Sequence, residues 1–357
     1  MAPARHARFR VRLAVIGALA VALAFGLTGT VAAKDKRDLT VMTRNLYLGA
    51  DIAQVLDAAT PFEFLVSVAT TYGQVQFTDF PTRAAAIAAE IETADADLVG
   101  LQEVANWTST GPGAPPSVDF LAILLQKLND RGLSYSVAAT SYNLSVGPVP
   151  LLFPCSAAPP SCQLSYEDRD VILVNNQRAG LQVSNPQSGR YDAQEVASSL
   201  AGPISFDRGW ASTDGTLDGK KFTFVTTHLE IEDFAPVQED QGREFLAGPA
   251  KGGGAVIAVG DFNSAADGST TSVYADLTKS WFADAWALNR GNVGLSCCQD
   301  PLLTNGTSHL HSRIDLVLTH GASRAVEAHL VGTAPFRGVP PLWPSDHAGL
   351  VATVRIH

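Results

Sequence analysis

Six short polar motifs, each attached to an apolar, strand-like run, carry the residues of this chain that could do chemistry. In chain order these motifs supply Asn45, Glu103, His228, Asp261 with Asn263, Asp315, and Asp346 with His347. Five of the six motifs contain Asp or Glu. Hard divalent cations bind carboxylate and amide oxygens, and phosphoester cleavage needs a metal, an oriented water and a proton donor. The set therefore predicts metal-dependent phosphoester chemistry.

The order and spacing of these motifs resemble the endonuclease/exonuclease/phosphatase family. That family includes deoxyribonuclease I, apurinic endonucleases, neutral sphingomyelinases and inositol polyphosphate 5-phosphatases. A Leu-Gln-Glu or Arg-Ile-Asp motif alone would be weak, because both occur by chance in many proteins. The specific feature is Gly-Asp-Phe-Asn at 260–263 followed by Ser-Asp-His at 345–347, with Asn45 and Glu103 upstream in the right order. The resemblance covers nearly all of the chain after residue 38.

Asn45 and Glu103 each end a predicted strand, and together they form a candidate metal site. An amide beside a carboxylate can hold one Mg²⁺ and leave several waters in its shell, as that ion prefers. The alternatives are a turn or helix cap for Asn45 and a solvated surface acid for Glu103. The resemblance implies that Asp346 is a second metal-binding acid. The sequence also leaves Mn²⁺ and Ca²⁺ open as the ion.

Asp261 and Asn263 lie in a turn that directly follows an apolar run. A strand followed by Gly260 and a turn projects both side chains from the same edge. Asp261 can accept a proton from the attacking water or position that water, and Asn263 can donate a hydrogen bond to a phosphate oxygen. The alternative is a simple Asp/Asn turn.

Two histidines are candidates for binding the phosphoryl group. His347 could neutralise the phosphoryl oxygens as an imidazolium, and Asp315 resembles the family acid that hydrogen-bonds this histidine. A neighbouring carboxylate would raise the pKa of the histidine and fix its tautomer. In the nuclease and sphingomyelinase branches, a histidine at the place of His228 contacts the phosphate or helps to protonate the leaving oxygen. A buried structural histidine is the alternative for His228.

Several further polar residues have less specific interpretations. Arg169 could make a bidentate contact with phosphate, or it could be a salt-bridged residue at the start of a strand. Asp51 could add a metal ligand or cap the helix that follows. We interpret Glu230 as a loop charge and His309 and His311 as surface residues.

Residues 1–33 are predicted to be a cleaved signal peptide, which implies a secreted protein. Four arginines between Arg5 and Arg12 precede an uncharged run over 13–33 that ends in small residues. A retained membrane anchor is the alternative, because the run is about long enough to span a bilayer. Residues 34–357 are expected to form one catalytic domain. Removing residues 1–33 removes four arginines and no acid, so that 21 basic and 35 acidic residues remain, a net charge of −14.

This acidic charge argues against a protein that holds polyanions by bulk attraction. It does not exclude a phosphodiesterase, because bound divalent cations can reverse the field locally. Four cysteines fit an exported protein. Cys155 and Cys162 could close a short loop, whereas Cys297 and Cys298 make either a vicinal disulfide or two bonds elsewhere, and three full pairings are open.

The elements expected to position these residues are strands interspersed with helices. Strands are predicted over 39–44, 97–102, 135–140, 170–174, 222–228, 255–260, 314–319 and 350–356. Helices are predicted from Thr82 to Glu92 with Thr82 as the cap, over 121–128, and over 237–247. The long segments 49–81 and 141–165 are interpreted as loops that form walls of the substrate site.

This pattern alone predicts one layered α+β domain. The resemblance implies a four-layer α/β/β/α sandwich like that of deoxyribonuclease I, with two mixed sheets face to face, helices outside, and the site at one end.

The function predicted from the sequence is a secreted, Mg²⁺-dependent phosphoesterase that cleaves phosphodiesters by in-line attack of water. The substrate would be nucleic acid or a phospholipid headgroup, and no stable protein partner is implied, so that a monomer is expected. The absence of a Lys/Arg stripe counts against a nuclease, and the absence of an obvious exposed aromatic hairpin counts against a membrane-docking sphingomyelinase. A phosphatase and a non-catalytic extracellular binding module are the remaining alternatives.

Overall fold

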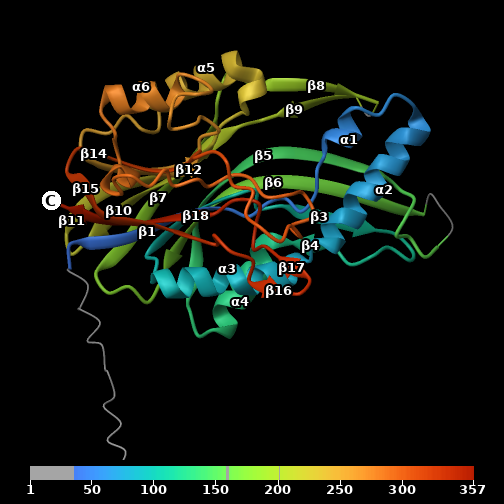
Figure 1. Cartoon of the computed structure of the whole chain (residues 1–357), viewed down its shortest axis with the longest axis horizontal. Helices are drawn as coiled ribbons and strands as arrows, with labels where there is room; N and C mark the ends of the chain where they lie inside the picture. Colours follow the sequence, from blue (N-terminus) through green and yellow to red (C-terminus); the bar gives the residue numbers. More distant parts are fainter. Residues whose placement is uncertain (1–35, 158–160, 201) are drawn as a thin grey trace, which may run out of the picture. The chain divides into compact units, whose positions relative to one another are not determined.

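A computed structural model describes residues 36–157, 161–200 and 202–357 of the chain (Figure 1). The predicted signal peptide, residues 1–33, lies outside the described residues. The described residues form one compact unit. Among the described residues, no helix is both long enough and apolar enough to cross a bilayer.

The first of two large sheets is built around the N-terminal strand. Its order is β15-β18-β1-β2-β6-β3-β4, and β5 also pairs with β6. β1 and β2 are parallel, and the other pairs are antiparallel. The strands are β1 Asp38–Asn45, β2 Leu98–Gln102, β3 Asn106–Thr110, β4 Val118–Asp119, β5 Tyr135–Leu151, β6 Cys162–Asn175, β15 Ser323–Val331 and β18 Gly349–Ile356.

The second sheet has the order β13-β14-β12-β11-β10-β7, in which only β11 and β12 pair in parallel. Two small hairpins, β8–β9 and β16–β17, stand apart from both sheets. The strands are β7 Leu181–Arg190, β8 Glu195–Ser199, β9 Gly202–Phe206, β10 Gly209–Leu217, β11 Lys220–His228, β12 Ala255–Asp261, β13 Ala283–Asp284, β14 Asp315–His320, β16 Arg337–Gly338 and β17 Pro341–Leu342.

The two sheets pack face to face through a shared apolar core. Val41 and Leu98 of the first sheet and Phe224 and Val259 of the second are completely or almost completely buried in it. At Gly100 in β2, an added Cβ would lie 2.4 Å from Val259 Cγ2, so the close approach of the sheets requires glycine there. These contacts fix how the strand ends of one sheet face those of the other.

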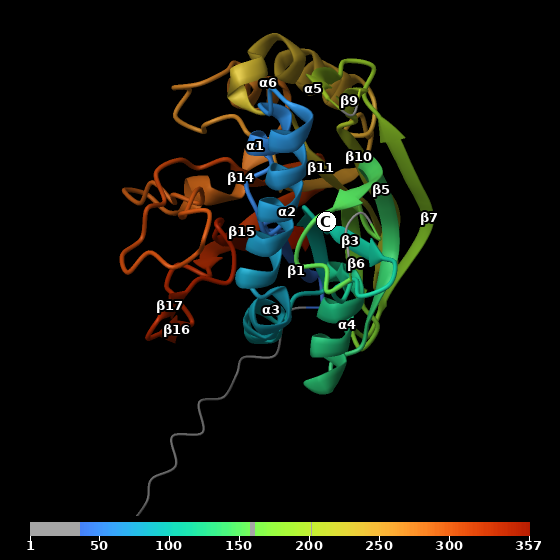
Figure 2. The ribbon, with the colours of Figure 1, turned by 90° about the vertical axis from the view of Figure 1, so that its right-hand side faces the viewer.

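Helices cover the outer faces of both sheets, which confirms the four-layer α/β/β/α sandwich expected from the resemblance (Figure 1). The first sheet carries α1 Ala53–Leu56, α2 Pro61–Phe77, α3 Phe80–Ala94 and α4 Phe120–Asp130. The second carries α5 Ala235–Ala247 and α6 Val273–Ser280, and short 3₁₀ turns lie at Glu232–Phe234 and Ala285–Leu288. Seen from the end that carries α1 and α2, these two helices lie in front of the strand ends (Figure 2).

The structure confirms the predicted strands but not the two long loops. Segment 49–81 contains α1 and α2, and α2 begins with a capping box in which Thr60 and Glu63 satisfy each other's backbone N–H. Segment 141–165 is largely the hairpin β5–β6. The predicted cap Thr82 is also wrong, because α3 begins at Phe80 and the side chain of Asp79 accepts the Thr82 N–H.

Candidate functional site

The polar motifs lie at strand ends that meet at one edge of the two sheets. Asn45 is the last residue of β1, and Glu103 follows β2 directly. In the second sheet His228 and Asp261 end the parallel strands β11 and β12, and Asp315, the first residue of β14, pairs with Asp261. The carboxyl ends of parallel strands share an edge, and the sheets face each other. These side chains therefore gather in one cluster.

The amide of Asn45 joins the two sheets at this cluster. Its Nδ2 donates to Glu103 Oε1 at 2.9 Å and to Asp261 Oδ2 at 3.1 Å, while its Oδ1 accepts the Tyr47 N–H at 2.9 Å. The second oxygen of Glu103 accepts the Leu48 N–H at 2.7 Å. Asn45 is fully buried. The amide thus holds two carboxylates from different sheets in a fixed relation.

His347 lies on the second-sheet side of the cluster, paired with Asp315. Its Nδ1 is 2.8 Å from Asp315 Oδ2, and its Nε2 is 3.8 Å from Asp261 Oδ2. Burial disfavours the charged ring, but the carboxylates of Asp315, Asp346 and Asp261 outweigh it and hold the pKa of His347 well above its usual range. His347 is therefore an imidazolium with its Nε2–H directed at the cluster.

Two buried arginines hold the segment that carries Asp346 and His347. Arg83 donates to the backbone carbonyls of Pro344 at 3.0 Å and Leu46 at 2.7 Å, and Arg44 donates to the carbonyl of His347. Neither side chain is exposed to solvent. Sequence analysis did not single out these two residues, because the carbonyls of Pro344 and His347 that they bind are more than 250 positions away. Arg44 also pairs with Glu90, at 3.0 Å.

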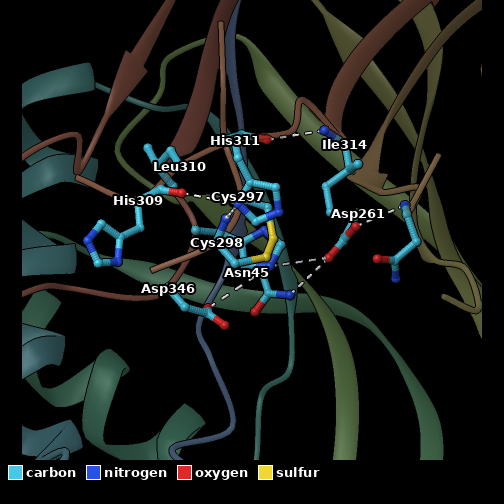
Figure 3. Close-up of a disulfide and its surroundings, with 12 residues drawn as sticks. Asn45, Asp261, Cys297, Cys298, His309, Leu310, His311, Ile314 and Asp346 are labelled. Carbon is cyan, nitrogen blue, oxygen red and sulfur yellow. Dashed lines mark hydrogen bonds and ion pairs between the residues drawn. A yellow bond between two sulfur atoms is a disulfide. The ribbon is translucent and has the colours of Figure 1, made fainter. Parts of the chain in front are cut away.

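A vicinal disulfide joins Cys297 to Cys298, and its sulfur atoms lie within 4.8 Å of a ring nitrogen of His347. Figure 3 shows this disulfide and its surroundings. The second disulfide joins Cys155 to Cys162, as the short loop suggested, and these two bonds settle the pairing.

Ser296, which precedes the vicinal disulfide, connects the backbone near Asp315 to the backbone near His347. Its Oγ accepts the N–H groups of Ile314 and Asp315, each at 3.2 Å, and its carbonyl accepts the Ala348 N–H at 2.7 Å. Segment 296–299 also binds Asp346, because Gln299 N donates to its carbonyl at 2.8 Å. The segment therefore links β14 to the chain that carries Asp346 and His347.

His228 lies on the opposite side of Asp261, in a different electrostatic setting. Its Nε2 is 3.6 Å from Asp261 Oδ2, and Arg208 Nη1 lies 3.0 Å from its Nδ1. Burial and the Arg208 charge lower the pKa of His228 well below its usual range. Since a guanidinium cannot accept a hydrogen bond, Nδ1 must be the acceptor and the ring proton must lie on Nε2.

Arg208 is a site residue that the sequence did not reveal. Its Nη2 lies 3.4 Å from Glu230 Oε1, and Glu230 is 3% exposed. Glu230 lies in the loop after β11, as expected, but it is buried and balances Arg208. No motif surrounds Arg208, which precedes β10, so only the fold brings it to His228.

A polar cleft extends from this cluster between β5, β6 and the end of β9. Glu103, Asn143, Asp168, Arg208 and His228 contribute its polar walls. Asn143 Nδ2 donates to Asp168 Oδ2 at 3.3 Å. Burial and the Glu103 charge raise the pKa of Asp168 to about 7. Sequence reasoning missed Asn143 and Asp168, because it assigned function to the neighbouring Arg169.

Arg169 itself does not face this cleft. Its Nε donates to the carbonyl of Val104 at 3.0 Å and its Nη2 to Asp119 Oδ1 at 2.6 Å. Side chains alternate along a strand, so Asp168 in β6 faces the cleft and Arg169 the opposite side. Arg169 is salt-bridged, as the alternative interpretation expected, but it lies well inside β6 and not at the start of a strand.

The remaining candidates occupy less central positions. Asn263 lies next to Asp261, whose Oδ1 accepts its N–H at 3.0 Å, but its side-chain amide donates to the carbonyl of Leu229. Asp51 is exposed, and its Oδ1 accepts the N–H of the first residue of α1 at 2.9 Å, which fits the capping interpretation. His309 and His311 are exposed, as expected.

The oxygen atoms of the cluster fit a divalent cation. Burial and the Asp346 charge raise the pKa of Glu103, and burial raises the pKa of Asp346. Burial, with Asp315 adding to it, raises the pKa of Asp261 to about 7. The raised pKa values mean that the negative charges of these buried acids are not fully balanced by the protein. A divalent cation would balance them, because carboxylate oxygens are the ligands that Mg²⁺, Mn²⁺ and Ca²⁺ bind. Asn45, in contrast, presents its amide N–H to Glu103 and Asp261.

Solved structures with the same architecture support the fold assignment. A family protein from Bacteroides thetaiotaomicron has a TM-score of 0.55 at 14% identity, with 90% of this chain and 95% of that chain covered. A protein from Beutenbergia cavernae has a TM-score of 0.53 at 20% identity, covering 90% and 72%. D. rerio TDP2, crystallised with a single-strand DNA product, has a TM-score of 0.53 at 15% identity, covering 89% and 99%.

Fold and sequence together define the class of protein. The architecture is the deoxyribonuclease I-like sandwich, and the sequence profile of the Endonuclease/Exonuclease/phosphatase family matches residues 71–347. The chain therefore belongs to the Endonuclease/Exonuclease/phosphatase family. Members of this superfamily are phosphoric ester hydrolases that generally use divalent metal ions. No curated protein sequence matches the chain.

Proposed function

We propose that this protein is a Mg²⁺-dependent phosphodiesterase that cleaves its substrate by in-line attack of water on phosphorus. The observation that carries the proposal is the convergence of Asn45, Glu103, Asp261, Asp315 and His347 from two facing sheets into one cluster. The family membership supports hydrolysis of a phosphoric ester, and the cluster supplies side chains for each part of that reaction.

Glu103 and Asp346, with Asn45 beside them, are the residues we propose to hold the metal. A divalent ion bound there would supply positive charge for the phosphoryl oxygens and help to position the attacking water. Mg²⁺ is proposed because it keeps several waters when only one or two carboxylates bind it. Mn²⁺ would satisfy the same oxygens.

Asp261 is the residue proposed to accept the proton of the attacking water. Its Oδ2 lies 3.6 Å from Nε2 of His228 and 3.8 Å from Nε2 of His347. As water adds to phosphorus, its proton passes to Asp261 and the P–O bond to the leaving group breaks on the opposite side. The raised pKa of Asp261, about 7, suits a group that takes up a proton near neutral pH.

His347 and His228 are proposed to bind the phosphoryl oxygens as two different donors. His347 offers a charged N–H, whose orientation Asp315 fixes, and His228 offers a neutral Nε2–H. Asn263 adds an amide at the rim of the cluster. Donors aimed at the oxygens where charge develops stabilise the transition state of the transfer.

The test is hydrolysis of bis(p-nitrophenyl) phosphate and p-nitrophenyl phosphate with Mg²⁺, Mn²⁺ or EDTA. We expect EDTA-sensitive cleavage of the diester and a loss of about 10²–10³-fold in His347→Ala, the range for removal of one preorganised donor. His329→Ala, at an exposed histidine on β15, is the matched control and should retain wild-type turnover. Preference for the monoester would make the protein a phosphatase. Metal-independent or undetectable turnover of both esters would contradict the proposal.

We also propose that the protein is secreted after removal of residues 1–33, and that it acts as a monomer. The basic start and the small-residue exit of that segment support secretion, as does the presence of two disulfides in the structure. N-terminal sequencing of the protein from culture medium would test cleavage after Ala33. Intact residues 1–33 in the membrane fraction would contradict it.

A further inference from the structure

An apolar cavity lies directly beside the polar cleft. Its walls come from α1, α2 and the strands β3, β5, β6 and β9, and they are almost entirely hydrocarbon. Val68 and Phe64 of α2 form one side, and Val146 and Val149 of β5 form another. Figure 2 shows α1 and α2 lying across this end of the first sheet. Nothing in the proposed phosphoester chemistry uses this space.

The cavity and the cleft adjoin each other. They share four lining residues, Ile52, Leu144, Tyr166 and Phe206. On the cleft side of these four residues stand Glu103 and His228, together with Arg208. A molecule whose phosphate lay against Glu103 and His228 would therefore direct one substituent into apolar surroundings.

The chemistry of the walls selects the kind of substituent. Thr71 Oγ1 already accepts from Gln54 Nε2 at 3.0 Å, and Trp107 Nε1 donates to the carbonyl of Leu48 at 2.9 Å. The third polar side chain, Tyr166, stands where the cavity meets the cleft. A nucleobase would bury several donors and acceptors here with few partners, which is unfavourable. A hydrocarbon chain loses no hydrogen bond and gains by leaving water.

The approach to the cavity is apolar as well. Val146 and Val149 are partly exposed, so the cavity reaches the surface along β5. Beyond them on the same hairpin, Phe153 is 49% exposed, and Leu200, between β8 and β9, is also 49% exposed. The ends of both hairpins lie at the same end of the sheets as α1 and α2 (Figure 1). The sequence showed no obvious exposed aromatic hairpin, and of these two residues Phe153 is the aromatic one.

We propose that this cavity binds the hydrocarbon chain of an amphiphilic phosphoester whose phosphate lies at the neighbouring metal cluster. The proposal deepens the proposed phosphodiesterase function by naming the substrate class, and it rests on that function for the place of the phosphate. It requires that affinity rise with the length of the chain.

The experiment measures binding of n-alkylphosphonates from methyl to octyl by calorimetry with Mg²⁺ present. Their C–P bond resists hydrolysis, so binding is measured without turnover. Each methylene that enters the cavity should tighten Kd about fourfold, and the heat capacity of binding should become more negative as the chain grows. A Kd that does not change with chain length would overturn the proposal.

Two matched variants tie the effect to the cavity. Val146→Trp should fill it and abolish the dependence on chain length while leaving methylphosphonate binding within about twofold of the wild type. Ser145→Trp places the same ring at the exposed neighbouring position of β5 and should retain the dependence. If Val146→Trp does not fold, Val149→Asn serves in its place. An unchanged slope in the folded cavity variant would also overturn the proposal.

Two further measurements separate the alternatives. Thymidine 5′-methylphosphonate that bound more tightly than octylphosphonate would overturn the proposal in favour of a nucleotide. Co-sedimentation with phosphatidylcholine vesicles only when they contain octadecylphosphonate would make a membrane the source of the chain, and no sedimentation would make it a soluble amphiphile. Cleavage of bis(p-nitrophenyl) phosphate reports on the proposed function independently, because that ester carries no alkyl chain.

Discussion

His347 and His228 are the same residue type within 4 Å of the same oxygen of Asp261, yet their surroundings give them opposite charge states. On one side, buried carboxylates including Asp315 raise the pKa of His347. On the other, burial and Arg208 lower the pKa of His228. Burial lowers the pKa of both rings, and the neighbouring charges, carboxylates for His347 and Arg208 for His228, then move the two pKa values apart.

This difference matters for the proposed chemistry, because two imidazolium rings around one carboxylate would repel each other. One charged and one neutral donor can both approach a phosphoryl group while Asp261 remains available for the proton of water. The two sides also differ in construction. The His347 side is held by backbone contacts from Ser296, Arg83 and Arg44, whereas the His228 side depends on the Arg208–Glu230 ion pair.

Of the variants considered, Asp315→Asn should have the largest effect on turnover, because it should remove the difference in charge between His347 and His228. The variant removes the charge that favours the imidazolium, so the pKa of His347 should fall toward its ordinary value. A neutral amide can also favour the wrong ring tautomer. We expect a loss of about 10²–10⁴-fold in diester turnover at neutral pH, the range for a disrupted acid–base partner. The check is the rate, combined with a ¹⁵N titration of His347 in EDTA.

The sign of the pH dependence follows from the direction of that shift. In the wild type His347 stays protonated well above the ordinary histidine range, so its titration in EDTA should lie at high pH. In Asp315→Asn the ring should lose its proton at lower pH, so the loss of turnover relative to the wild type should become smaller as the pH falls. The comparison is made as a ratio because protonation of Asp261, whose pKa is about 7, lowers the turnover of both proteins. An unshifted titration of His347 in the variant would show that Asp315 does not control its charge.

Arg208→Met acts on the His228 side of the site, and its effect should be comparable to that of Asp315→Asn or smaller. It leaves Glu230 buried without its partner, which costs about 3–5 kcal/mol in the free energy of unfolding. It also removes the charge that helps to lower the pKa of His228, so that pKa should rise. Chemical denaturation and a ¹⁵N titration of His228 measure the two effects.

The double variant Arg208→Met/Glu230→Gln separates stability from charge state. Removing both charges should recover part of the lost stability, because Glu230 is then no longer an unpaired buried charge, but the pKa of His228 should stay raised. If the single variant is as stable as the wild type, the ion pair does not hold this side of the site.

The contrast between the two sides also marks how far the sequence could predict the site. Asp261, Asp315 and His347 were predictable because each lies in a short motif at the end of an apolar run. Arg208 and Ser296 lie in no motif, and their partners are distant in sequence, so only the fold brings them to the histidines. For Arg169 and Asp168, sequence alone could not decide which face of β6 points into the cleft.

The central strands and the layers of the fold were predictable from the sequence, but two segments were not. The central strands carry unbroken apolar runs, and the resemblance supplied the layers. Segment 49–81 misled because Thr70, Thr71 and Gly73 are weak helix formers, although Thr60-Pro-Phe-Glu63 is a capping-box signal at the start of α2. Segment 141–165 misled because Gly147, Pro148 and Pro150 are typical of loops, whereas the hairpin accommodates them with shifts in register.

Ser296→Ala has the smallest expected effect, and it tests whether the His347 side can be changed without changing the His228 side. The hydroxyl accepts two backbone N–H groups, those of Ile314 and Asp315, and both are left without this acceptor in alanine. The cost should be about 1–3 kcal/mol, the price of an unsatisfied buried polar group. Because the change lies on the His347 side, turnover should fall while the titration of His228 stays unchanged. Ser280→Ala, at the exposed last residue of α6, is the matched control. A shift in the titration of His228 equal to that of His347 would mean that the two sides of the site are one mechanical unit, and that their different charge states do not reflect independent construction.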